Sequence, residues 1–220
     1  MKSTYRFVTL FLMALLLCTA FHPVSGQMFL PVTGSLESSV ASDPTTVPGL
    51  DQFSQQVRNG LATQVTGIYA ENLFAFPVVQ QPQNQPGYVS TAADTITEFR
   101  SAQSFGSLGF LAHNTLAGGK FSGVSVGGLL AVVYGDGHSV LYQVKQVLRF
   151  QAVEPKNPYS SFIDLASGKT LTAEELFYAT YGVKEHLILQ TCISAAGNDS
   201  WGRLFLIAEP YIPPGTQSIR

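Results

Sequence analysis

Two β-rich runs joined by a glycine-rich turn are the feature that most constrains the fold of this chain. Residues 129–134 read Leu-Leu-Ala-Val-Val-Tyr, and residues 140–150 are again rich in Val, Leu, Tyr and Phe. Between them stands Gly135-Asp-Gly-His138. β-branched and aromatic residues favour strands, whereas glycine and aspartate favour the tight turns of hairpins. The pattern therefore predicts a β-hairpin over residues 129–150.

Shorter apolar runs before and after this hairpin predict further strands. Residues 64–79 predict a strand followed by a Gln/Pro-rich loop, and residues 95–99 alternate with the period of a strand. Residues 108–113 form a short apolar run that ends in a histidine. Residues 186–192 and 203–209 predict two last strands, separated by a loop of roughly ten residues. So many short strands predict a mostly β fold, either a barrel or a sandwich.

One short helix is marked by its N-terminus. Thr172-Ala-Glu-Glu175 matches a capping box, in which the Thr172 hydroxyl accepts from the backbone amide of Glu175 and the Glu175 carboxylate reaches back. The pattern predicts a helix over residues 173–180, with Leu176 and Phe177 facing inward. We therefore expect one or two short helices beside the strands.

The first 26 residues have the pattern of an export signal. Lys2 and Arg6 precede an almost unbroken apolar stretch, and small residues follow at Val24-Ser-Gly26. The apolar stretch is shorter than the ~20 residues that a membrane span needs. We expect cleavage and export, to a secreted or an extracytoplasmic cell-surface location. The alternative is an uncleaved signal that anchors the protein in the membrane.

Composition divides the rest of the chain. Residues 27–59 form a Ser/Thr/Pro-containing segment, which predicts a flexible leader, and patterning begins near Gly60. Residues 60–213 are enough for one packed domain, and residues 214–220 form a tail. The formal net charge is −2 at pH 7, without a basic run. The charge pattern therefore gives no support for a nucleic-acid partner.

The chemistry that the sequence suggests centres on one cysteine. The chain has two cysteines, Cys18 within the predicted signal and Cys192 at the end of the strand predicted over residues 186–192. Removal of the signal would leave Cys192 as an unpaired thiol in an oxidising compartment. Such a thiol is either buried and inert or retained for chemistry. A nucleophilic thiol must ionise, and free cysteine titrates near ~8.5 unless a cation stabilises the thiolate.

Two residues are candidates to activate this thiol. Of the histidines, His138 lies in the hairpin turn and reads as a solvated residue, and His186 lies ~20 Å from Cys192 along the same strand. His113 begins a loop, where catalytic groups are common. Arg203 begins the last predicted strand, and its guanidinium would lower the thiol pKa and stabilise an oxyanion. His113, Cys192 and Arg203 form a candidate set for acyl transfer.

The same residues also have structural interpretations that involve no catalysis. A lone cysteine in an apolar strand often behaves as a small buried hydrophobe. An arginine at the start of a strand often pairs only with a surface carboxylate. For Cys192 in isolation the structural interpretation is favoured, and the matching contexts of His113 and Arg203 favour the catalytic one.

Over residues 60–213 these features resemble the sortases, the cysteine transpeptidases of bacterial surfaces. The resemblance is carried by Ala112-His113-Asn114, Gly119-Lys-Phe121, the hairpin with Gly135-Asp136, Leu189-Gln-Thr-Cys192 and Arg203-Leu-Phe-Leu-Ile-Ala. The order of histidine, cysteine and arginine is part of the likeness. The resemblance implies a closed sortase-type β-barrel.

The resemblance also implies a reaction and its partners. Cys192 would attack the Thr–Gly bond of a sorting signal of the form Leu-Pro-x-Thr-Gly on surface proteins, and an amine from peptidoglycan or a pilin-type lysine would resolve the thioacyl intermediate. His113 would transfer protons, Arg203 would hold the substrate or the oxyanion, and Thr191 and Asn114 would line the substrate pocket. The carboxylates are scattered, so we expect neither a metal nor another cofactor.

The leader contains a sequence that bears on this expectation. Leu30-Pro-Val-Thr-Gly34 reads as a sorting signal. Chance within a Pro/Thr-rich segment is the favoured explanation, and an intramolecular contact in which this segment acts as a tethered pseudo-substrate is the alternative. A different class of function also remains open: a secreted, non-catalytic β-domain, an inactive sortase relative that binds peptide or glycan.

Overall fold

The computed structural model of the protein describes residues 47–157 and 159–214. The predicted signal and the run Leu30-Pro-Val-Thr-Gly34 lie outside the described residues. In chain order the elements are α2 (Leu50–Gln56), β1 (Val65–Ala70), β2 (Phe74–Gln80), β3 (Ile96–Glu98), α3 (Arg100–Gln103), β4 (Leu108–Leu111), the 3-10 helix η2 (Ala117–Gly123), β5 (Leu129–Tyr134), β6 (Ser139–Ala152), β7 (Phe162–Asp164), β8 (Thr170–Leu171), α4 (Ala173–Tyr181), β9 (Leu187–Ala195) and β10 (Asn198–Pro210).

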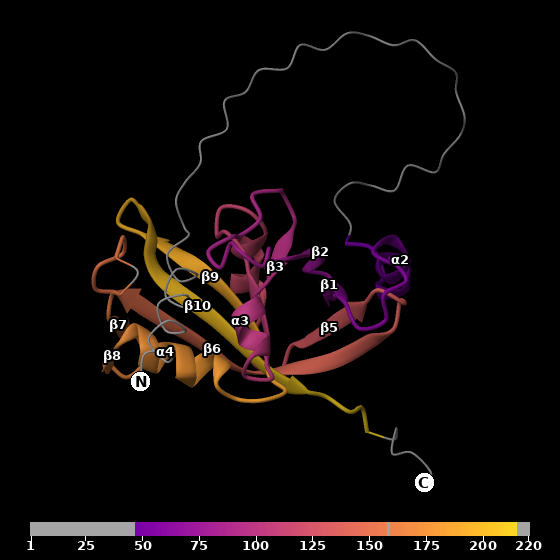
Figure 1. The fold of residues 1–220 in the computed structure, drawn as a ribbon. Coiled ribbons are helices and arrows are strands. Elements are labelled where there is room, and N and C mark those ends of the chain that lie inside the picture. The colour runs from indigo at the N-terminus through magenta and orange to yellow at the C-terminus, as the bar shows by residue number, and fades with distance from the viewer. Residues whose placement is uncertain (1–46, 158, 215–220) are drawn as a thin grey trace, which may run out of the picture.

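The strands form one sheet that closes on itself. Their order is β10-β9-β4-β3-β2-β1-β5-β6-β7-β8, and a further pairing between β10 and β6 closes the first eight strands of that order into a barrel (Figure 1). Two neighbouring pairs are parallel, β2 with β3 and β4 with β9. Strands β7 and β8 extend the sheet beyond the closure. The predicted fold class, a mostly β closed barrel with short helices, is confirmed.

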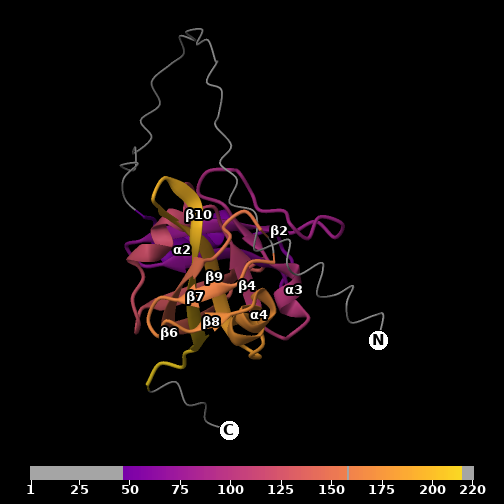
Figure 2. The same cartoon turned by 90° about the vertical axis from the view of Figure 1, so that its left-hand side faces the viewer.

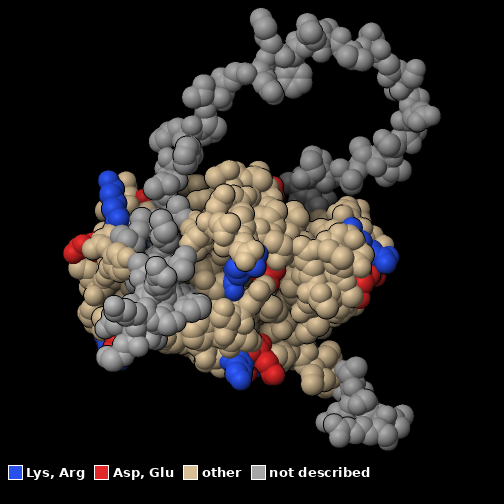
Figure 3. All heavy atoms as spheres, in the orientation of Figure 1, with Lys and Arg blue, Asp and Glu red and all other residues tan. Residues whose placement is uncertain are grey.

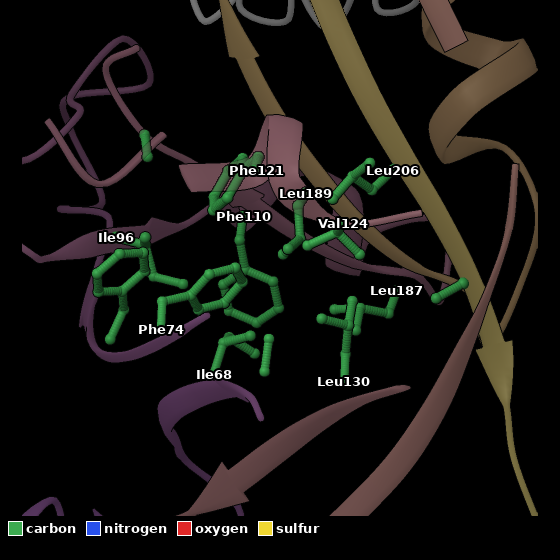
Figure 4. Close-up of a cluster of buried hydrophobic side chains, with 14 of the residues drawn as sticks. Ile68, Phe74, Ile96, Phe110, Phe121, Val124, Leu130, Leu187, Leu189 and Leu206 are labelled. Atoms are coloured by element: carbon green, nitrogen blue, oxygen red, sulfur yellow. The ribbon is translucent and has the colours of Figure 1, made fainter. Parts of the chain in front are cut away.

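The interior of the barrel is filled by apolar side chains, which we call the inner cluster. Ile68, Leu130, Leu187, Leu189 and Leu206 are among its fully buried members, and in Figure 4 they point toward one another between the strands. Because side chains of a strand alternate between its two faces, the residues between these members face the outside of the barrel. Residues an even number of positions apart on one strand therefore share a face.

A second, outer cluster covers one side of the barrel. Helix α4 contributes Leu176, Phe177 and Tyr181, which pack with Phe205 of β10 and Ile188 of β9. Figure 2 shows α4 beside β7 and β8 on this side of the molecule. Helix α2 covers another part of the outer surface, since its buried Phe53 packs with residues of β1 and β5. That helix lies within the segment, residues 27–59, that the sequence assigns to a flexible leader.

Two local predictions are confirmed in detail. The hairpin predicted over residues 129–150 is formed by β5 and β6, which pair antiparallel. The capping box at Thr172 is present, with the backbone amide of Glu175 donating to the Thr172 hydroxyl at 3.1 Å, and Leu176 and Phe177 are buried. Local chemistry decides both features, which is why the sequence alone predicts them.

Two other predictions are wrong. Residues 64–79 form two antiparallel strands, β1 and β2, because Asn72 adopts a positive φ of 58° and turns the chain back. The loop expected between the last two strands is also absent, since β9 and β10 form a continuous hairpin with a tight turn at Ala196 and Gly197. These two residues have φ values of 50° and 73°, and positive φ at both central positions is typical of two-residue hairpin turns.

Charged side chains are sparse and dispersed on the molecular surface. On the face shown in Figure 3, Lys and Arg side chains stand apart from one another and alternate with acidic ones. Within the described ranges, no helix combines the length and the apolar character required to cross a membrane.

Candidate active site

Cys192 and Arg203 lie directly opposite each other on two adjacent strands. In the antiparallel pairing of β9 with β10, Arg203 is the partner of Cys192, and on its other side Arg203 pairs with Phe150 of β6. Phe150 belongs to the outer cluster. Since directly opposed residues project from the same face, Cys192 and Arg203 both belong to the outer face, with Cβ atoms ~5 Å apart. The long hairpin therefore brings two of the predicted site residues together.

His113 reaches the same region through the parallel pairing of β4 with β9. Leu111 is the partner of Gln190, and the amide of Ala112 donates to the carbonyl of Gln190 at 3.2 Å. The Thr191 hydroxyl donates to the carbonyl of Ala112 at 2.9 Å. His113, the residue after Ala112, therefore lies at the level of Cys192. All three predicted catalytic residues therefore lie in one region, beside the C-terminal half of β9.

Burial changes the basicity of the His113 imidazole. The side chain is half-buried, and its partial removal from water lowers its pKa below the ordinary value of 6.5, although a hydrogen bond with the backbone of Val89 opposes the shift. Val89 packs against the outer cluster, which agrees with a place for His113 on the outer face. At neutral pH the imidazole is therefore mainly neutral and able to accept a proton.

Arg203 is a buried cation. Its exposed fraction is 2 %, and one terminal nitrogen donates to the carbonyl oxygens of Ser200 at 3.0 Å and Gly202 at 2.8 Å. The guanidinium carbon lies 5.7 Å from the centre of the Phe162 ring. Burial lowers the pKa of Arg203 to about 10, so the side chain still carries its positive charge at neutral pH.

Cys192 is buried, with an exposed fraction of 6 %, and is disulfide-bonded in the structure. The other cysteine of the chain, Cys18, lies outside the described residues. The sequence predicts an unpaired thiol only after removal of the signal, which would leave Cys192 as the single cysteine. Cys192 can therefore act as a nucleophile only when its disulfide is reduced.

A cavity of about 260 Å³ lies beside Cys192. Its lining includes Thr191 and Asn114, the two predicted substrate-binding residues, and also Arg149 of β6. His113 and Arg203 are not among the lining residues. The cavity thus reaches Cys192 from the rim of the barrel, whereas Arg203 lies beside Cys192 on the outer face.

Thr191 and Asn114 also hold the site together. The hydroxyl of Thr191 ties β9 to the residue before His113, as described above. The side-chain amide of Asn114 donates to the hydroxyl of Ser194 at 2.6 Å and to the carbonyl of Asp199 at 3.1 Å, so the loop after β4 is fastened to the tip of the β9–β10 hairpin. These contacts give both residues a positioning role in addition to their place on the cavity wall.

Gly118 is a positioning residue that the sequence analysis missed. A Cβ atom at this position would collide with the Thr191 hydroxyl and would lie 2.8 Å from the carbonyl oxygens of Ala112 and His113. The amide of Gly118 donates to the His113 carbonyl at 3.0 Å. Only a glycine lets η2 approach this closely. The Gly118-Gly119 pair just after His113 was the available signal.

The two remaining histidines of the described chain lie away from the site. His138 stacks on Tyr134 and contacts Asp136 at 2.5 Å within the β5–β6 turn, in agreement with its interpretation as a turn residue. His186 precedes β9 at the end opposite to Cys192, and lies 3.8 Å from Glu209. Neither is placed to exchange a proton with Cys192.

Comparisons with known proteins give similarity at the level of structure. The chain matches the sequence profile of no known protein family, and no curated protein matches it. Among solved structures it is similar to sortase A from Listeria monocytogenes, at 14 % identity over 67 % of this chain and 88 % of that chain, with a TM-score of 0.42. It is also similar to sortase C from Clostridium perfringens, at 12 % identity over 74 % and 86 % of the two chains and a TM-score of 0.42. A lid mutant of sortase A from Corynebacterium diphtheriae has 13 % identity over 76 % and 80 %, and a TM-score of 0.43.

Proposed function

We propose that the protein is an exported cysteine transpeptidase in which Cys192 is the nucleophile. The observation that carries this proposal is the convergence of three residues that are distant in the sequence. Arg203 is the direct cross-strand partner of Cys192, and the pairing of β4 with β9 brings His113 to the same part of β9. A thiol nucleophile, an imidazole that transfers protons and a guanidinium that stabilises an oxyanion are together suited to acyl transfer through a thioester.

Each group has a defined task in this reaction. The positive charge of Arg203 favours the thiolate of reduced Cys192 and then the oxyanion that forms when the thiolate attacks a peptide carbonyl. His113 accepts the proton of the Cys192 thiol, gives it to the amine that leaves, and later accepts a proton from the amine that enters. Because thiol and imidazole interact, their protonation belongs to the pair rather than to either residue.

The substrate class follows from the sequence motifs that resemble the sortases. The donor is a sorting signal of the form Leu-Pro-x-Thr-Gly on a surface protein, and the acceptor is an amine from peptidoglycan or a pilin-type lysine. The predicted signal over residues 1–26 agrees with a location outside the cytoplasm, at the cell surface or in the secreted fraction. A disulfide at Cys192 blocks this chemistry, so the active form is the reduced one.

A non-catalytic β-domain that binds peptide or glycan is the second candidate. The burial of Cys192 and its disulfide favour this alternative, because both oppose attack on a substrate. The two functions differ in turnover. A binding domain would retain a Leu-Pro-x-Thr-Gly peptide without cleaving its Thr–Gly bond.

Cleavage of a donor peptide tests the proposal. The full chain, kept in a reducing buffer, is incubated with Leu-Pro-Ala-Thr-Gly flanked by a fluorophore and a quencher. We expect cleavage at the Thr–Gly bond, its loss in Cys192→Ala, and a reduction of ~100-fold or more in His113→Gln. His138→Gln is the matched control and retains activity. Binding without cleavage by the wild-type chain would favour the non-catalytic domain instead.

A further inference from the structure

The loop of residues 81–95, between β2 and β3, contacts His113 through the backbone of Val89. Burial lowers the pKa of His113, and the hydrogen bond with the Val89 backbone acts in the opposite direction. A carbonyl that accepts from an imidazole N–H raises the pKa of the ring, because the protonated ring donates more strongly than the neutral one. The group that contacts the imidazole is therefore the carbonyl of Val89.

The strand pairing independently places this part of the loop beside His113. The backbone amide of Ser90, the residue after Val89, donates to the Thr97 hydroxyl at 2.8 Å. Thr97 of β3 is the direct partner of Leu111 of β4, which lies two residues before His113. Leu111 belongs to the outer cluster, against which Val89 packs. The contact between Val89 and His113 therefore lies on the outer face of the barrel, the face of the candidate site.

Gln81 holds the same stretch of the loop from its other side. This side chain is buried, and its amide nitrogen donates to the carbonyls of Pro86 at 2.9 Å and Tyr88 at 3.1 Å. Its side-chain oxygen accepts from the backbone amide of Arg100 at 3.3 Å. Because Tyr88 directly precedes Val89, hydrogen bonds hold the backbone immediately before Val89 as well as immediately after it.

Arg100, the first residue of α3, fixes Gln81 in turn. Its guanidinium donates twice to the backbone carbonyl of Gln81, at 3.3 Å and 3.0 Å. A buried amide side chain costs free energy unless its polar groups are paired. Since both ends of the Gln81 side-chain amide are paired, this network favours one conformation of the loop over others.

We propose that Gln81 and Thr97 are positioning residues for His113. They hold the Val89 carbonyl where it accepts from one ring nitrogen of the imidazole, so the other nitrogen keeps its lone pair for proton transfer. A neutral imidazole can carry its proton on either nitrogen, and a fixed acceptor selects one of the two tautomers. Catalytic bases are commonly oriented in this way by a third group. This inference rests on the proposed function, in which His113 transfers protons.

The tautomer of His113 tests the inference with a readout that a merely structural role would not move. NMR chemical shifts of the two imidazole nitrogens in the reduced full chain report which of them carries the proton. We expect one tautomer in the wild-type chain. In Gln81→Met and in Thr97→Val we expect both tautomers and a lower midpoint of titration, because the carbonyl no longer stabilises the protonated ring. Both tautomers in the wild-type chain, or one tautomer and an unchanged midpoint in the two variants, overturn the inference.

Matched variants separate positioning from a general loss of stability. Gln80→Met makes the same change at the neighbouring residue, whose side chain donates instead to the Val65 carbonyl at 3.0 Å, and should leave the tautomer of His113 unchanged. Thr97→Ser keeps the hydroxyl and should also retain the wild-type tautomer. Where Gln81→Met does not fold, the comparison of Thr97→Val with Thr97→Ser carries the test, since valine preserves the shape of the side chain. An equal change of tautomer in Thr97→Val and Thr97→Ser overturns a role for the hydroxyl.

Turnover distinguishes a failure of this inference from a failure of the proposed function. With the donor peptide, Gln81→Met and Thr97→Val should lower kcat about fivefold and change KM less, because a smaller fraction of His113 is oriented for proton transfer. A change of tautomer in the variants of a chain that cleaves no donor supports the positioning of His113 and removes the proposed function alone. Donor cleavage at the wild-type rate in both variants overturns the inference and leaves the proposed function intact.

Discussion

Arg203 of β10 and Cys192 of β9 are direct partners in an antiparallel pair, and Arg203 is 2 % exposed. The cross-strand register, rather than a flexible side-chain contact, therefore fixes their relation. A cation in such a dry position interacts more strongly with a nearby anion than it would in water. We therefore expect substitution of Arg203 to change the reactivity of Cys192 directly.

Removal of the Arg203 charge should slow the reaction of reduced Cys192 with iodoacetamide. Because a nearby cation lowers a thiol pKa by about one to three units, Arg203→Gln should reduce the alkylation rate at neutral pH by roughly tenfold or more. Arg203→Lys keeps the charge and should retain part of the rate, and Arg58→Gln, an exposed site, serves as the control. Circular dichroism verifies that each variant is folded. An equal rate in Arg203→Gln would show that the guanidinium does not act on the sulfur.

A side chain at Gly118 should disturb the site through Thr191. In Gly118→Ala the new Cβ meets the Thr191 hydroxyl and two carbonyl oxygens, which should cost about 1–3 kcal/mol of unfolding free energy. Donor cleavage should also fall, because the carbonyl of His113 is one of the displaced groups. Gly123→Ala, also in η2, meets its nearest side-chain atom at an ordinary 3.5 Å and should be mild. Urea unfolding of both variants measures the difference, and equal costs would contradict the close-approach argument.

Loss of the Thr191 hydroxyl should loosen the link between β9 and β4. Thr191→Val removes the hydrogen bond to the Ala112 carbonyl and leaves a buried acceptor, which should cost about 1–3 kcal/mol. Thr191→Ser retains the hydroxyl and should restore most of the activity. Thermal unfolding and donor cleavage measured together would test this. A Thr191→Val variant with wild-type kcat and stability would remove Thr191 from the positioning residues.

The lowered pKa of His113 has a consequence for stability at acidic pH. The unfolded chain takes up a proton on this residue near pH 6.5, whereas the folded chain binds it only at lower pH. The contribution of His113 to the free energy of unfolding is therefore fully present above pH 6.5, and decreases as the pH falls through and below that value. His113→Gln should flatten this part of the profile. NMR titration of the imidazole checks the cause directly, and a midpoint above 6.5 would contradict it.

The sequence predicts those parts of the fold that local chemistry decides. The β5–β6 hairpin and the capping box of α4 follow from turn and cap residues, and the chain order of His113, Cys192 and Arg203 points to the site. The length of the β9–β10 hairpin is not predicted, because Ala196 adopts a positive φ that its residue type does not favour. Arg149 is not predicted either. Its place in the lining of the cavity beside Cys192 depends on the register of three strands, which no local pattern encodes.

The most direct test of a nucleophilic Cys192 is the intact mass of the reduced full chain after exposure to a Leu-Pro-Ala-Thr-Gly donor and rapid acid quenching. We expect an added mass equal to the Leu-Pro-Ala-Thr acyl group, mapped by peptide digestion to Cys192, sensitive to hydroxylamine and absent from Cys192→Ala. An unmodified chain under conditions where the reduced thiol reacts with iodoacetamide and the donor remains bound would contradict a nucleophilic role for Cys192.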